Sequence, residues 1–140
     1  MAQKWSALVL VALFVFVGCA SKKPFRLSNA YPMPPSIKRL SEPGACQGGE
    51  ALAARTLIVP KYPRFAKRQG RQGWVVAKLD VRPDGQTDAV SIKRSAPGGV
   101  FDGSAIKAIE KWQFAPVGGT GLKNCLVFID YRLGQVRIGR

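Results

Sequence analysis

The sequence of 140 residues contains no histidine and only eight carboxylate side chains, against 22 Lys and Arg. Histidine is the side chain that most often moves protons near neutral pH, and it is a common metal ligand. Ser91, Ser95 and Ser104 therefore have no histidine to activate them as nucleophiles. These absences weigh against an enzyme, and the sequence indicates no metal site and no cofactor.

Long hydrophobic runs are also lacking beyond the first eighteen residues. One apolar run extends from Ala7 to Val17, behind the basic residue Lys4. A membrane-spanning helix needs about 20 apolar residues, whereas the core of an export signal needs about 7 to 15. We therefore interpret residues 1–18 as a cleavable export signal.

The segment FVGC ends this run and places Gly18 directly before Cys19. It resembles the bacterial lipobox, in which a peptidase cuts before a cysteine that carries diacylglycerol. Phe16 and Val17 depart from that pattern, which usually has Leu and a small residue at these positions. The resemblance predicts lipidation at Cys19, and acyl chains would hold the protein firmly on a membrane. An ordinary signal followed by an unrelated cysteine is the alternative.

Two further cysteines, Cys46 and Cys125, remain after Cys19. In an exported protein such a pair favours a disulfide over two free thiols. No CxxC motif or histidine partner is present that would indicate a metal or redox site. The loop closed by this bond would hold about 80 residues, and the chain-entropy model assigns it roughly 4 kcal/mol of stabilisation.

Residues 19–57 form a second region, which is rich in Pro and Gly and poor in hydrophobic periodicity. Such a composition is typical of an extended tether. We expect only its end, near Cys46, to be fastened to a domain, and that domain to occupy residues 58–140.

The remaining patterns predict a small domain. RFAKRQ indicates a short helix after Pro63, and alternating apolar residues indicate a hairpin with RPDGQ between its strands. A longer helix should follow, with Asp102 as its N-cap and Trp112 on its apolar stripe. Residues 122–132 then indicate a last strand. The order α-β-β-α-β predicts the α+β class, with two helices packed on one face of a three-stranded antiparallel sheet.

The first predicted helix and its flanks are strongly basic. Their spacing of three and four residues places most of these side chains on a common face. A solvated surface is the simplest interpretation, and a patch for anionic lipid, lipopolysaccharide or another envelope polymer is the alternative. The basic patch consists of Lys61, Arg64, Lys67, Arg68 and Arg71.

The segments PKYPRFAKRQGRQGWVVAKLDV, DGQTDAVSI, FDGSAIKAIEKWQFAP and VFIDYRL resemble, in this order, the C-terminal domain of TonB and its relatives. The resemblance runs from Pro60 to about Leu133. It implies a periplasmic domain that adds a TonB-box segment of an outer-membrane transporter as a strand beside the last strand. Tyr62, Phe101 and Trp112 are expected to pack rather than to contact a partner.

The residues that this resemblance assigns to partner-strand binding all belong to the predicted strand from Leu122 to Arg132. They are Leu122, Lys123, Asn124, Leu126, Val127, Phe128, Ile129 and Tyr131. Cys125 lies among them, so a bond to Cys46 would draw the end of the tether beside this edge. The segment ARTLIVP could itself occupy the edge and block or regulate capture.

The family's energy transducers carry an inner-membrane helix, which meets the ExbB and ExbD motor proteins, and a long Pro-rich spacer. The leader of this chain instead looks cleavable, and Ala20 after Cys19 resembles the case of sorting to the outer membrane. Residues 20–57 could span at most about 130 Å. These departures favour a lipid-anchored, periplasm-facing protein-binding module of the outer membrane, accessory to TonB-dependent transport or part of an envelope complex. A motor-coupled transducer and an envelope-polymer binder are the alternatives, and the export signal argues against nucleic acid.

Overall fold

The computed structural model describes residues 30–40, 46 and 53–139. The expected signal at 1–18 and the expected lipidation site Cys19 lie outside these residues. Within the described part of the chain, no helix is long and apolar enough to span a membrane.

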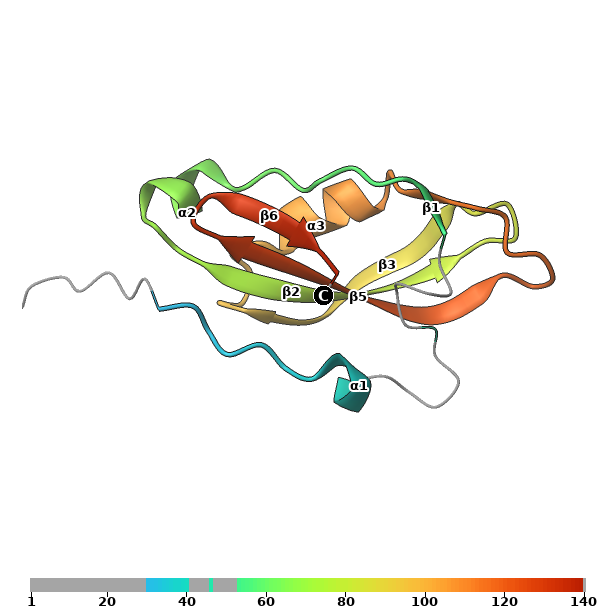
Figure 1. Cartoon of the computed structure of the whole chain (residues 1–140), viewed down its shortest axis with the longest axis horizontal. Helices are drawn as coiled ribbons and strands as arrows, with labels where there is room; N and C mark the ends of the chain where they lie inside the picture. The colour runs from blue at the N-terminus through green and yellow to red at the C-terminus, as the bar shows by residue number, and fades with distance from the viewer. Residues whose placement is uncertain (1–29, 41–45, 47–52, 140) are drawn as a thin grey trace, which may run out of the picture.

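The main sheet is antiparallel, with its strands in the order β3-β2-β5-β6 (Figure 1). Strands β2 (Gly73–Val81) and β3 (Thr87–Ala96) are the predicted hairpin, and β5 (Leu122–Arg132) is the predicted last strand. The sheet has one strand more than the three predicted. Strand β6 (Gln135–Ile138) turns back along β5 after Leu133 and Gly134, whose φ angles are 49° and 79°. Two consecutive positive φ angles are what a tight two-residue hairpin requires.

Helices α2 (Arg64–Arg68) and α3 (Asp102–Ile109) cover one face of this sheet, so the α+β class and the two helices on one face are confirmed. Ala66 of α2 and Ala105 and Ile109 of α3 pack there against Val75, Ala77 and other inward-facing residues of β2. This is the helix face of the sheet, and it contains the larger part of the core.

The second predicted helix differs from expectation at both ends. Phe101 is the N-cap residue and makes no capping hydrogen bond through its side chain, whereas Asp102 is already the first helical residue. The helix ends at Ile109, where a tighter turn follows because the Trp112 amide donates to the carbonyl of Ile109 at 2.9 Å. Trp112 therefore lies beyond the helix, although its side chain is still buried in the core.

A second, two-stranded sheet joins β1 (Ala54–Thr56) to β4 (Gln113–Phe114). The segment ARTLIVP thus pairs with β4 and does not occupy the edge of β5, which corrects the sequence-based expectation. The residues that follow β1 are fixed by the Trp112 indole, which donates a hydrogen bond to the carbonyl of Ile58 at 2.8 Å.

The other face of the sheet is covered by residues 30–40, which we call the N-terminal strap; it includes α1 (Ile37–Leu40) (Figure 1). Trp74, Val76, Leu126 and Phe128 are buried on this face. Their covering residues in the strap are Tyr31, Ile37 and Leu40. The expectation that only the end of the tether near Cys46 is fastened is therefore wrong for residues 31–40.

The strap is held by polar contacts as well as by apolar packing. The Trp74 indole donates to the carbonyl of Pro32 at 3.1 Å. The Arg132 guanidinium lies 3.7 Å from the centre of the Tyr31 ring, and Asp130 holds that guanidinium through an ion pair of 3.0 Å. A cation–π contact at such a site contributes about 0.5–1 kcal/mol. A Pro-rich segment without helical or strand periodicity is thus fixed by a few specific contacts.

Candidate functional site at the sheet edge

Strand β5 places the predicted partner-binding residues on two opposite faces. Side chains alternate along a strand, and Val127, Ile129 and Tyr131 accordingly pack into the helix face. Leu126 and Phe128 are 3% and 2% exposed beneath the N-terminal strap. These side chains are therefore core residues, and only the backbone of β5 could meet an added strand.

The backbone edge of β5 is already occupied along most of its length. Strand β6 pairs with residues 129–132, and the Gly139 amide donates to the carbonyl of Phe128 at 2.9 Å. Further along, the Leu126 amide donates to the carbonyl of Cys46 at 3.0 Å. The sequence left open whether the edge between Leu122 and Arg132 is free or covered, and in the structure the chain itself covers it from 126 to 132.

The structure joins Cys46 to Cys125 in a disulfide, with their Cα atoms 4.4 Å apart. Cys125 is fully buried on the helix face, and Cys46 packs against the same core. The bond fixes the Cys46 carbonyl beside Leu126. A segment distant in sequence therefore becomes part of the β5 edge.

The first residues of β5 are held by Asp80 of β2. The Asp80 carboxylate accepts a hydrogen bond from the Asn124 amide at 2.9 Å and forms an ion pair of 2.9 Å with Lys123. Partial burial raises the pKa of Asp80, but the contacts with the Asn124 amide and Lys123 outweigh this effect and hold the pKa below 3.8. Asn124 has a φ of 55°, so this end of β5 departs from regular strand geometry.

Strand β6 ends the sheet, and no described segment pairs with its outer edge. Residues opposite each other in an antiparallel pair alternate between bonded and non-bonded pairs. The Arg132–Gln135 pair closes the hairpin, and Gly139 bonds to Phe128. The backbone N–H and C=O groups of Val136 and Ile138 consequently point away from β5. Sequence reasoning missed this strand, although the alternation in QVRI after Gly134 was an available signal.

An aromatic cluster lies behind this edge on the helix face. Phe101 stacks on Tyr131 with ring centres 4.3 Å apart, and Tyr62 meets both rings edge to face. Burial raises the pKa of Tyr131 to about 12. The Tyr62 hydroxyl donates to the carbonyl of Arg71. The cluster therefore supports α2 and the last strands structurally.

The five residues of the predicted basic patch, Lys61, Arg64, Lys67, Arg68 and Arg71, are all exposed. They lie on α2 and its flanks rather than along the β5 edge. Among the described residues, no three Cys, Asp or Glu side chains are grouped so that they could hold a metal ion.

Comparison with known proteins shows which proteins the chain resembles. Protein TonB of Klebsiella pneumoniae is 28% identical over 118 residues, which cover 82% of this chain and 47% of that protein. Protein tonB2 of Pseudomonas aeruginosa is 32% identical over 57 residues, 41% of this chain and 21% of that protein. The chain therefore spans less than half the length of both relatives.

A solved structure matches the fold over most of the described domain. The solution NMR structure of the Pseudomonas aeruginosa TonB CTD has a TM-score of 0.54 and 25% identity, covering 64% of this chain and 94% of that one. The model of the family described as Gram-negative bacterial TonB protein C-terminal matches residues 59–133. These residues are more than half of the chain, and the chain belongs to this family.

Proposed function

We propose that this protein is a non-enzymatic binding module of the cell envelope, which captures an extended segment of a protein partner by strand addition at the outer edge of β6. The proposed partner is a TonB-box-like segment of an outer-membrane transporter. In this proposal Cys19 carries the lipid anchor, and the domain faces the periplasm from the outer membrane. The module would act as an accessory to TonB-dependent transport or within a larger envelope complex.

The outer edge of β6, with which no described segment pairs, is the single observation that carries the proposal. An exposed edge offers backbone donors and acceptors to an added strand. The opposite edge of the sheet is a poorer template, because β3 pairs with register shifts and presents the charged residues Asp88 and Arg94. Strand β6 instead continues the register of β5 without a shift.

The edge is short, which sets the expected strength of capture. Val136 and Ile138 together offer four outward backbone groups, and each hydrogen bond contributes about 1 kcal/mol net. A total of about 4 kcal/mol corresponds to a dissociation constant of about 1 mM at best, because association also costs translational and rotational freedom. Backbone pairing alone therefore gives transient capture, and confinement of both proteins in one compartment would raise the occupancy.

The docked strap supports an anchored module over a transducer that bridges the envelope. Because residues 31–40 are bound to the sheet, only residues 19–31 separate the proposed anchor from the domain. Twelve residues reach at most about 40 Å, compared with about 130 Å for the whole predicted tether. A bridging role would first require the strap to leave the Trp74 and Phe128 face.

Site-specific photocrosslinking in intact cells tests the proposal. A crosslinker at Arg137, which is exposed on β6, should capture a transporter segment. A crosslinker at Phe128 should capture only the protein's own strap, because that side chain is buried beneath it. Capture of a partner from Phe128 but not from Arg137 would contradict the proposed edge.

A chain that ends at Gly134 lacks Arg137, so for this comparison the crosslinker is placed at Leu133, which is 84% exposed and present in both chains. This truncated chain separates addition to β6 from replacement of β6. If the partner adds to β6, the truncation abolishes crosslinking to the transporter. If the partner replaces β6 beside β5, the truncation increases it, and the proposal of addition is overturned.

A further inference from the structure

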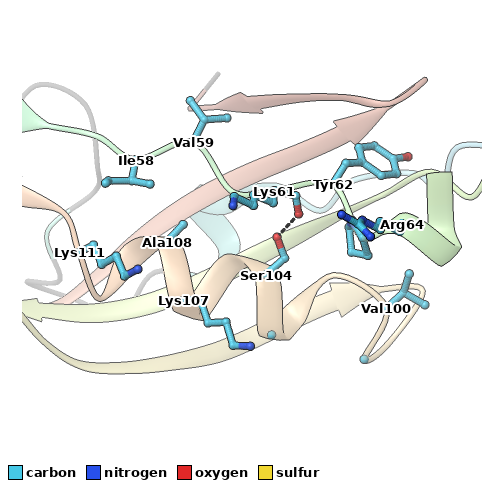
Figure 2. A pocket seen from close by; sticks show the side chains of 13 residues that line it. Ile58, Val59, Lys61, Tyr62, Arg64, Val100, Ser104, Lys107, Ala108 and Lys111 are labelled. Atoms are coloured by element: carbon cyan, nitrogen blue, oxygen red, sulfur yellow. Dashed lines mark hydrogen bonds between the residues drawn. The ribbon is translucent and has the colours of Figure 1, made fainter.

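An open groove of about 640 Å³ lies between residues 58–64 and helix α3 (Figure 2). Four cationic residues surround it: Lys61 and Arg64 on one side, Lys107 and Lys111 on the other. No carboxylate is among the residues that line the groove. The Ser104 hydroxyl of α3 donates to the Lys61 carbonyl and so fixes the two sides relative to each other.

Exposed apolar side chains accompany these cations. Ile58, Val59 and Phe65 are 43%, 56% and 44% exposed, and all three belong to the segment that carries Lys61 and Arg64. Ile58 and Val59 also line the groove itself. Ile58 and Val59, left this open beside the basic side chains of the groove, indicate an interaction surface.

The two features together select the kind of partner. A cluster of cations alone would suit any polyanion, but a soluble polyanion offers nothing that removes Ile58 and Val59 from water. An anionic lipid surface meets both needs, because its phosphates pair with the basic side chains while apolar side chains enter the boundary between headgroups and acyl chains.

We infer that the face formed by residues 57–65 and α3 binds the surface of an anionic phospholipid membrane. This lipid-binding face consists of Ile58, Val59, Lys61, Arg64, Lys107 and Lys111. It extends the predicted basic patch, since Lys107 and Lys111 come from a different element. The face uses no residue of the β6 edge, so it stands or falls independently of strand capture.

Hydrogen exchange of the full chain reconstituted in vesicles tests this inference. One set of vesicles contains phosphatidylcholine alone, and the other an equal mixture with phosphatidylglycerol. We expect amides in residues 57–65 and 102–111 to exchange about tenfold more slowly in the anionic vesicles. For the protein without substitutions, high salt should remove the difference in exchange between the two sets of vesicles, because screening weakens the attraction of exposed charges.

Charge reversal locates the contact. Lys107→Glu with Lys111→Glu should abolish the slower exchange in anionic vesicles. Arg39→Glu with Arg94→Glu is the control, because it changes the net charge equally on exposed residues of α1 and β3. Arg94 pairs with Val76 and so lies on the strap-covered side of the sheet, away from the lipid-binding face. The control variant should therefore still exchange more slowly in anionic vesicles.

Two outcomes would overturn the inference. Equal exchange of residues 57–65 and 102–111 in neutral and anionic vesicles would show that this face does not bind lipid. The same slowing produced by soluble polyglutamate in neutral vesicles would assign the groove to an acidic protein segment instead.

Discussion

The two faces of the main sheet are closed in different ways. The helix face is covered by α2 and α3, which lie within the residues 59–133 that match the family. The opposite face is covered by the N-terminal strap, which lies outside that match. The residues that match the family therefore cover one face of the sheet with their own helices, whereas a Pro-rich segment outside the match covers the other face.

A fragment limited to the family domain would lack the N-terminal strap and Cys46. A fragment that begins at residue 59 keeps Phe101 and Tyr131 buried but exposes Trp74 and Phe128. It also loses Cys46, which covers the Leu126 amide at the β5 edge. Such a fragment would thus leave the Leu126 amide uncovered at the β5 edge, while β6 still pairs with residues 129–132.

Among single substitutions, the largest loss of stability is expected on the helix face. Phe101→Ala removes a fully buried ring that stacks on Tyr131. It should lower the free energy of unfolding by about 3–5 kcal/mol, measured by urea denaturation. Phe65→Ala, at a residue that is 44% exposed, is the control and should change it by less than about 0.5 kcal/mol.

The disulfide joins Cys46 to Cys125 of β5 and should have the next largest effect. Cys46→Ala with Cys125→Ala opens a loop with a sequence separation of 79. The chain-entropy model predicts a loss of about 4 kcal/mol, measured by denaturation under non-reducing conditions. An unchanged midpoint would show that the strap and β1 hold this segment without the bond.

A smaller effect is expected on the strap-covered face. Ile37→Ser with Leu40→Ser weakens packing by partly buried side chains, and should cost about 1–2 kcal/mol. The indole N–H of Trp74, which donates to Pro32, should exchange with solvent faster. Met33→Ser, at a strap residue that is 89% exposed, should leave both quantities unchanged. A strap variant without effect would contradict docking.

The smallest effect concerns the start of β5. Asp80→Asn removes a carboxylate whose pKa lies below its ordinary 3.8 in the folded protein. The ionised form therefore stabilises the fold above about pH 4, and this contribution is lost as the pH falls through the folded pKa. The variant should be less stable by about 1 kcal/mol at neutral pH. Denaturation at several pH values should show this difference shrinking in acid; a constant difference would contradict the assignment.

Local sequence patterns predicted most elements of the helix face. The strap and the cover of the β5 edge depend on contacts between residues far apart in the sequence, which local patterns do not reveal. The alternation along β2 and β5 and the basic turn of α2 each follow from neighbouring residues, so their positions could be predicted. The strap could not, because prolines separate Tyr31 from Ile37, and the three-residue spacing of Ile37 and Leu40 is too short a pattern to predict a docked helix. The cover of the β5 edge depends on where Cys46 and β6 meet that edge, which spacing along the sequence does not determine.

The most direct test of the account is residue-resolved hydrogen exchange of the free protein by NMR. Cys46 and β6 cover the β5 edge, and none of the residues that the structure describes pairs with the outer edge of β6. We therefore expect slow exchange for the Leu126 and Gly139 amides, which donate to Cys46 and Phe128, and fast exchange for Val136 and Ile138. Fast exchange at Leu126 together with slow exchange at Val136 would contradict this arrangement.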